Sequence, residues 1–155
     1  MIPVRRLNHA VLFVRDLERA VAFYQEAFGF EIVAREPRAQ AAFLRARGTD
    51  NHHDLGLFAV GAQAPSPPRG SVGLYHLAWE VDSIHDLAAA QDTLSRLGAL
   101  VGASDHAVTK SLYGRDPDGN EFEVMWTVPR EHWGEFEHAA PVLPLDLPAE
   151  VARYG

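Results

Sequence analysis

The chain has 155 residues, of which 47% are hydrophobic and 23% charged, a composition typical of a soluble globular protein with one compact domain. Its net charge of −7 disfavours a nucleic acid or another polyanion as a partner, and the lack of cysteine excludes disulfide bonds and thiolate metal sites. No apolar run is long enough to span a membrane, and no secretory cleavage pattern opens the sequence. We therefore expect a cytoplasmic protein without a membrane partner.

The first half of the chain predicts a strand, a helix and three further strands. Polar and apolar residues alternate in the first strand, Leu7–Val14. Apolar residues then recur at helical spacing as far as Phe28, with Asp16 as the N-cap and Gly29 just past the helix end. The three strands that follow are expected at Phe30–Arg35, Ala41–Ala46 and Asp54–Val60.

A Pro-rich connector, Ala62–Gly70, interrupts this pattern and is typical of a linker. The same order then restarts with an alternating strand, Leu74–Val81. A helix follows, with Ser83 and Asp86 as a capping box at its start and Gly98 at its end. Three more strands are expected at Ala99–Ala103, Thr109–Gly114 and Asn120–Trp126.

The order β-α-β-β-β therefore occurs twice, in halves of about residues 5–61 and 72–127. When LNHAVLFV is set over LYHLAWEV, His9 and His76 take equivalent positions in the two first strands. We predict an α+β fold in which the curved sheets of the two repeats form one open-barrel cleft.

We expect a single domain over residues 1–130, and a C-terminal tail, residues 131–155, that packs on or over the cleft. The last hairpin of the domain turns at residues 116–119, where DPDG has Pro and Gly at the positions that type I turns favour. In the strand after it, Glu123 lies on the face opposite the apolar residues and points into the space that the sheet encloses. A carboxylate there is costly unless it meets a cation or hydrogen-bond donors.

Three side chains are candidate metal ligands: His9, His76 and Glu123. Each histidine, taken alone on an apolar strand face, is more often a core residue than a metal ligand. Their equivalent places in the repeat, together with an inward carboxylate, favour a divalent-metal site. Two imidazoles and one carboxylate are the ligand set of non-haem Fe(II) oxygen chemistry.

These motifs resemble those of the vicinal oxygen chelate superfamily, the glyoxalase/bleomycin-resistance/dioxygenase fold, over almost the whole chain. The matching stretches are LNHAVLFVRDLERAVAFYQEAFGFE, LYHLAWEV and DPDGNEFEV. The resemblance implies metal ligands at His9, His76 and Glu123, with Glu121 as a variable residue beside the ligand. It implies no single reaction, because the same scaffold carries several chemistries.

Within the superfamily, the chain is most similar to the short, catechol-2,3-dioxygenase-like branch of the extradiol ring-cleaving enzymes. The residues that carry this similarity are the candidate catalytic residues His53, His106 and Tyr113. The resemblance implies that His53 accepts a substrate proton, that Tyr113 donates to a substrate oxygen and that His106 acts as donor or acid. A solvated His53, or a Tyr113 that packs in the core with a wet hydroxyl, would fit the same pattern.

The same resemblance implies Fe(II) as the cofactor, or Mn(II) or another divalent metal, and a small catecholic substrate together with O₂. Members of this fold often dimerise, so a homodimer is one expected assembly. We expect an apolar pocket for a flat ring. Its expected lining is Phe13, Leu57, Trp79 and Met125.

Three other functions remain open at the level of sequence. A glyoxalase-type isomerase or lyase usually needs a further glutamate on the last strand of the first half, and His53–Val60 contains none. A fosfomycin-type thiol transferase needs a cationic phosphonate pocket, for which Lys110 and Arg115 are the candidates. A non-enzymatic, bleomycin-resistance-like binding protein generally lacks the complete set of two histidines and a glutamate. The expected function is therefore extradiol ring cleavage.

Overall fold

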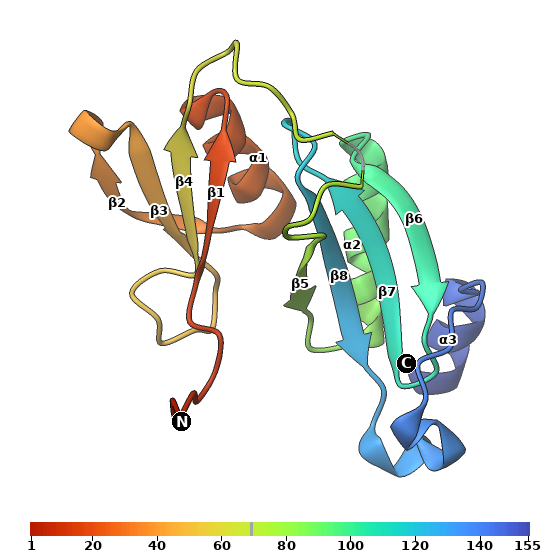
Figure 1. Cartoon of the computed structure of the whole chain (residues 1–155). Helices are drawn as coiled ribbons and strands as arrows, with labels where there is room; N and C mark the ends of the chain where they lie inside the picture. The colour runs from red at the N-terminus through yellow and green to blue at the C-terminus, as the bar shows by residue number, and fades with distance from the viewer. Residues whose placement is uncertain (69) are drawn as a thin grey trace. The chain divides into compact units, whose positions relative to one another are not determined.

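The computed structural model describes residues 1–68 and 70–155 (Figure 1). It divides the chain into two compact units, Met1–Ser71 (unit 1) and Val72–Gly155 (unit 2). The positions of the units relative to one another are not determined.

Unit 1 is a four-stranded mixed sheet with a helix packed on one face. The strand order is β1-β4-β3-β2, in which β1 runs parallel to β4 and the other pairs are antiparallel. A short 3-10 turn, Pro37–Ala39, joins β2 to β3. The elements are β1 (Ala10–Val14), α1 (Leu17–Phe28), β2 (Glu31–Glu36), β3 (Ala41–Arg45) and β4 (Leu55–Ala59).

Helix α1 begins and ends where its caps predict. The Asp16 carboxylate accepts a hydrogen bond of 3.0 Å from the Arg19 N–H, and Gly29 ends the helix with φ of 65°, a left-handed conformation that glycine adopts without strain. The α1 side of the sheet is buried. Its buried residues include Leu12, Val14, Ala20, Val21, Tyr24, Leu44, Leu55 and Leu57.

The face of this sheet opposite α1, here called the far face of unit 1, is more exposed. Val11 and Phe13, which alternate with the buried residues of β1, are 50% and 71% exposed. Leu57 pairs with Leu12 and is completely buried, so the expectation that Leu57 lines a ligand pocket is wrong. Side chains alternate between the two faces of a strand, and Leu57 falls on the face that packs against α1.

Unit 2 repeats the order of elements and the strand arrangement, as β5-β8-β7-β6 with β5 parallel to β8. The Ser83 hydroxyl accepts the Asp86 N–H at 3.1 Å and so caps helix α2, as the capping box predicts. The elements are β5 (Leu77–Glu80), α2 (Ile84–Arg96), β6 (Leu100–Asp105), β7 (Thr109–Arg115) and β8 (Glu121–Thr127). The α+β class and the twofold β-α-β-β-β repeat are thus confirmed, with neither four-stranded sheet closed into a barrel.

Strand β8 divides its side chains between two faces, as its alternation predicts. Phe122, Val124 and Trp126 are buried on the side that α2 covers (Figure 1), whereas Glu123 lies on the opposite, far face of unit 2. Trp79 pairs with Val124 and therefore faces α2. The expectation that Trp79 lines a ligand pocket is therefore wrong, because its side chain, like that of Leu57, falls on the helix side of its sheet.

The first residue of the turn before β8, Asp116, accepts the hydrogen bonds that hold the turn together. The Gly119 N–H donates to the Asp116 carbonyl at 3.0 Å. The Asp116 carboxylate also accepts the N–H groups of Asp118 and Asn120, each at 2.9 Å. Asp116 is only 5% exposed, and these bonds compensate the burial of its charge.

Both first strands are shorter than the alternation predicts. Pairing begins at Ala10, opposite Leu55, and at Leu77, opposite Phe122. The residues before Ala10 and Leu77 alternate in polarity but lie outside the ladders. His9 and His76 consequently lie one residue before a strand, at equivalent places in the two units.

The expected linker contains neither helix nor strand at residues 62–68 and 70, and Arg69 lies outside the described residues. After β8, short 3-10 turns at Arg130–His132 and Gly134–His138 lead to helix α3, Leu147–Tyr154. Every helix of the described chain is too short or too polar to cross a membrane.

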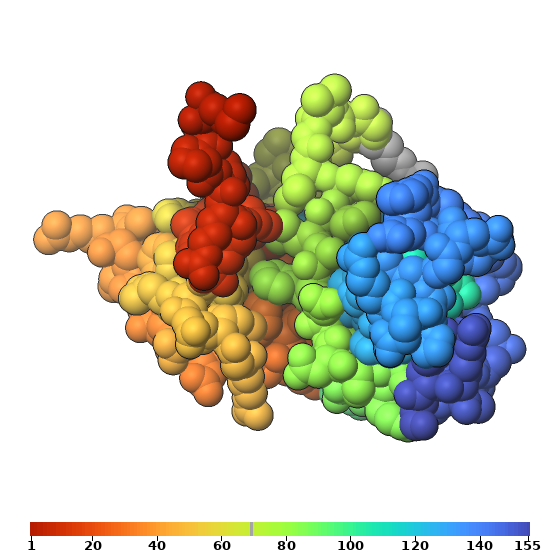
Figure 2. Space-filling view, turned by 90° about the horizontal axis from the view of Figure 1, so that it is seen from below, coloured from red at the N-terminus to blue at the C-terminus, as the bar shows by residue number. Residues whose placement is uncertain are grey.

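Helix α3 packs on the α2 side of unit 2. The Tyr154 and Trp126 rings lie 5.2 Å apart between centroids, and the Glu150 carboxylate lies 3.3 Å from the Lys110 ammonium nitrogen. In the space-filling view, the tail (darker blue) lies directly against the rest of unit 2 (Figure 2). The tail is therefore part of the packed body of unit 2.

Candidate metal and catalytic site

The six predicted site residues fall into two groups, one in each unit. His9 and His53 lie together in unit 1. The group in unit 2 comprises His76, His106, Tyr113 and Glu123.

In unit 1 the rings of His9 and His53 lie 4.5 Å apart between centroids. The Phe43 ring packs against His53 at 5.0 Å, and the Nδ1 atoms of His52 and His53 are 3.1 Å apart. Burial, and then repulsion from His9 and His52, lowers the pKa of His53 below its usual 6.5. His53 is therefore neutral at pH 7.

Asn51 holds the two histidine segments of unit 1 together, and it is 7% exposed. Its side-chain amide donates to the Asn8 carbonyl at 2.8 Å and to the Asp54 carboxylate at 2.6 Å. The residue before His9 is thus tied to the residue after His53. Sequence reasoning missed this role because an asparagine in a polar loop gives no local signal of burial.

In unit 2, β5 and β8 bring the candidate ligands together. His76 Nε2 lies 3.1 Å from Glu123 Oε2, and the two side chains are 26% and 12% exposed. Tyr113 of β7 pairs directly with Glu123, and its ring centroid is 5.8 Å from that of His76. An imidazole, a carboxylate and a phenol therefore share the far face of unit 2.

The His76–Glu123 geometry fits two donors to one divalent ion. Two ligand atoms at about 2.1 Å from a metal and at right angles are about 3.0 Å apart, close to the distance seen here. Over residues 1–68 and 70–155, however, no group of three or more His, Asp or Glu side chains is arranged to hold a metal. The third predicted ligand, His9, belongs to unit 1.

His106 bridges Tyr113 and the C-terminal tail. Its Nε2 lies 2.8 Å from Tyr113 Oη, and its Nδ1 lies 2.6 Å from the Pro141 carbonyl oxygen. Burial and, secondly, the charge of Glu123 raise the pKa of Tyr113 above its usual 10. Tyr113 therefore keeps its proton at neutral pH and can donate it in a hydrogen bond.

Both cations considered for a phosphonate pocket are in ion pairs. Lys110 is 3% exposed and faces the α2 side, with its ammonium 2.6 Å from Asp105 and 3.3 Å from Glu150. Arg115 pairs with Glu121, the residue two before Glu123, at 3.1 Å. Neither cation offers a free charge for a phosphonate.

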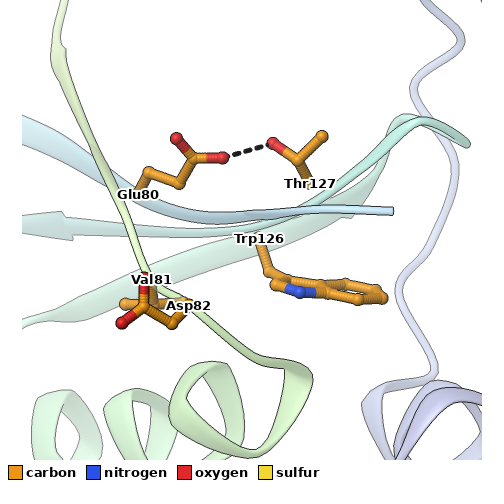
Figure 3. Close-up of a pocket in the computed structure, with 5 residues that line it drawn as sticks. All are labelled: Glu80, Val81, Asp82, Trp126 and Thr127. Atoms are coloured by element: carbon orange, nitrogen blue, oxygen red, sulfur yellow. Dashed lines mark hydrogen bonds between the residues drawn. The ribbon is translucent and has the colours of Figure 1, made fainter. Parts of the chain in front are cut away.

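A pocket of about 350 Å³ opens at the carboxyl ends of β5 and β8 (Figure 3). Two of its lining residues are joined by a hydrogen bond of 2.6 Å, in which the Thr127 hydroxyl donates to the Glu80 carboxylate. The remaining lining residues are Val81, Asp82 and Trp126. None of the six predicted site residues lines this pocket, so it is separate from the candidate site.

The sequence matches the family model described as Glyoxalase/Bleomycin resistance protein/Dioxygenase superfamily over residues 6–124. The chain belongs to this superfamily. The membership confirms the resemblance seen in the two histidine strands and the closing hairpin. It extends over both units, since residues 6–124 include β1 to β7 and the first part of β8.

Several curated relatives are named as dioxygenases. The catechol-2,3-dioxygenase of Bacillus subtilis (strain 168) is 34% identical over 131 residues, which cover 82% of this chain and 43% of the relative. Biphenyl-2,3-diol 1,2-dioxygenase 3 of Rhodococcus globerulus is 33% identical over 127 residues, which cover 81% of this chain and 65% of the relative. The chain thus spans less than two thirds of the length of either relative.

Solved structures show the same fold. A glyoxylase/bleomycin resistance protein/dioxygenase domain from Frankia sp. EAN1pec has a TM-score of 0.68 at 23% identity, covering 83% of this chain and 97% of that one. A lactoylglutathione lyase from Agrobacterium tumefaciens has a TM-score of 0.60 at 28% identity, covering 86% and 99%. Because a lyase shares the fold, the fold by itself does not select the reaction.

Proposed function

We propose that the chain is a metal-dependent extradiol dioxygenase that cleaves a catecholic ring with O₂. The observation that carries the proposal is the group on the far face of unit 2, where His76 and Glu123 meet beside Tyr113 and His106. The two relatives named as diol dioxygenases support this choice of reaction over others in the superfamily.

In this proposal His9, His76 and Glu123 hold Fe(II), or Mn(II) in its place. When bound, such an ion supplies Lewis acidity towards the diol oxygens and one-electron chemistry towards O₂. Neutral imidazole and carboxylate are the donors that these ions accept, and no thiolate competes for them.

The remaining residues of the site orient the substrate and move its protons. His53, neutral at pH 7, accepts a proton from a substrate hydroxyl at Nε2 while Nδ1 stays engaged with His52. The Phe43 ring packs against the His53 imidazole, with 5.0 Å between the ring centroids. Phe13, exposed on the same far face of unit 1, offers apolar surface to a flat ring.

The competing functions are each disfavoured by an observation. Strand β4, Leu55–Ala59, offers no glutamate as a fourth ligand of the glyoxalase type. Lys110 and Arg115 are already paired with carboxylates, which argues against a fosfomycin-type transferase. Non-enzymatic binding proteins of this fold generally lack the complete set of two histidines and a glutamate, which this chain contains as His9, His76 and Glu123.

Metal analysis combined with oxygen uptake tests the proposal. We expect protein loaded anaerobically with Fe(II) to retain about one ion per chain, and to consume O₂ and form a yellow ring-opened product with at least one catechol of a panel. Chelator-stripped protein, before and after reloading, is the control. Metal-free protein that binds aromatic ligands tightly and shows no oxygen uptake after reloading would overturn the dioxygenase assignment.

A further inference from the structure

The two hydrogen bonds of His106 assign its tautomer. A carbonyl oxygen can only accept, so the 2.6 Å contact with Pro141 requires the proton of the imidazole to be on Nδ1. In the neutral ring Nε2 then has no proton, and it can only accept. The donor in the 2.8 Å contact is therefore the Tyr113 hydroxyl.

We propose that the Pro141 carbonyl of the C-terminal tail sets this tautomer, and that Tyr113 and His106 thereby form a proton relay that leads away from the substrate. The substrate part of this inference rests on the proposed function, whereas the tautomer does not. The direction is the reverse of the role that the family resemblance implies for Tyr113, which is donation to a substrate oxygen. Tyr113 already gives its proton to His106, so its oxygen has lone pairs to offer a substrate hydroxyl.

The relay balances with these groups alone. The substrate O–H bond breaks and its proton goes to Tyr113 Oη, while the original Tyr113 proton moves to His106 Nε2. The substrate becomes an anion and His106 an imidazolium, whose Nδ1–H remains bonded to the Pro141 carbonyl. A charged donor strengthens that hydrogen bond, so the tail stabilises the product of the proton transfer.

The tail is held in place next to His106 by a backbone bridge. The Asp105 N–H donates to the Leu143 carbonyl at 2.8 Å, and the Leu143 N–H donates to the Asp105 carbonyl at 2.9 Å. Because Asp105 directly precedes His106, this bridge places the Pro141 carbonyl, two residues from Leu143, at the imidazole. Pro141 acts through its backbone and is a positioning residue.

A second set of contacts fixes Asp105 itself. One oxygen of its carboxylate accepts the Lys110 ammonium at 2.6 Å and the Ala107 N–H at 2.7 Å. Ala107 has φ of 66°, a left-handed conformation that costs a non-glycine residue about 1 kcal/mol or more. Lys110 also meets Glu150 of α3, so one buried cation links the His106 segment to the tail helix.

Long-range 1H–15N NMR of the metal-free full chain tests the tautomer, with His106→Gln identifying the His106 signals. We expect the wild type to carry its proton on Nδ1. Leu143→Pro removes the N–H that closes the bridge and should lower the Nδ1–H population, whereas Leu143→Ala keeps that N–H and should match the wild type. A proton on Nε2 or on both nitrogens of the wild type would overturn the inference, as would an unchanged His106 spectrum in folded Leu143→Pro.

A second variant keeps the test decisive if Leu143→Pro does not fold. Tyr113→Phe removes the donor to Nε2 but leaves Pro141 in place, so His106 should keep its Nδ1 proton while the Nε2 resonance moves to that of a free acceptor. Loss of the Nδ1 proton in Tyr113→Phe would show that the tyrosine, and not the tail, selects the tautomer. These spectra need neither metal nor catechol, so their outcome is independent of whether the chain cleaves a ring.

Discussion

The two units follow the same plan and differ in what they place on their far faces. Each has a parallel pair at one edge, a capped helix and a histidine one residue before its first strand. Unit 1 adds a second histidine, His53, and a phenylalanine, whereas unit 2 adds Glu123, Tyr113 and His106. The two units thus share their strand pairing and helix caps and differ in the side chains on their far faces.

The units also differ in how they hold these residues. Unit 1 uses one buried side-chain amide, Asn51, whose partners are three residues away on one side and 43 on the other. Unit 2 uses the tail, which reaches His106 from 35 residues away and adds a helix on the covered face. The far face of unit 2 is therefore supported by more of the chain than that of unit 1.

The largest expected effects are on metal binding and turnover, and they distinguish the proposed metal ligands from the proposed catalytic base. Mutating a residue that only hydrogen-bonds to a metal ligand typically lowers metal affinity by about 10–100-fold. Loss of a ligand itself, in Glu123→Gln or His9→Ala, should therefore weaken metal binding by more than about 100-fold. His53→Ala should keep the metal and lower turnover by about 10²–10⁴-fold, the usual worth of a general base. Metal content by atomic absorption and oxygen uptake measure the two effects.

The contrast also tests the assignment of His53. Equal metal loss in Glu123→Gln, His9→Ala and His53→Ala would show that His53 is a ligand and not a base. Retention of metal by Glu123→Gln together with loss from His53→Ala would reverse the roles proposed for the two residues.

The space available for a side chain differs between one glycine of each unit, Gly114 in unit 2 and Gly56 in unit 1. A Cβ added at Gly114 would lie 2.4 Å from the buried Phe122 ring, so Gly114→Ala should destabilise the protein by about 3 kcal/mol, the upper end of overpacking costs. A Cβ at Gly56 would lie 3.3 Å from Val11, which is half exposed and can move, so Gly56→Ala should change stability by about 0.5 kcal/mol or less. Urea unfolding of both variants measures the difference, and equal costs would contradict it.

The anchor of unit 1 can be removed with a single substitution. Asn51→Ala leaves Asp54 Oδ1 without its 2.6 Å donor and should destabilise the protein by about 1–3 kcal/mol, the cost of a buried unsatisfied group. Asn51→Asp sets a second carboxylate against Asp54 and should cost more. Asp50→Ala, at an exposed position of the same loop, is the matched control, and urea unfolding should leave it close to the wild type.

The smallest expected effect is a pH dependence of unit 1. The pKa of His53 is lowered by burial first and by His9 and His52 second, so the unfolded chain takes up this proton at a higher pH than the folded chain. Stability should therefore be complete above pH 6.5 and fall as the pH drops from 6.5 through the folded pKa. Unfolding of metal-free wild type and His53→Gln at several pH values measures it, and an equal decline in both would assign it to other groups.

The sequence by itself determined the features that depend on neighbouring residues. The caps at Asp16 and Ser83, the turn at Asp116 and the position of Glu123 on the face opposite the helix follow from short-range periodicity and local hydrogen bonds. These need only a few consecutive residues, so the pattern of the repeat was sufficient to find them.

The tertiary structure decided the contacts that join distant segments. The starts of β1 and β5 depend on where β4 and β8 begin, and alternation alone extends both strands too far. The same holds for the buried role of Asn51 and for the proton on His106, which depends on the tail carbonyl at Pro141. Such partners lie tens of residues away in the sequence, and only folding brings their donors and acceptors within hydrogen-bonding distance.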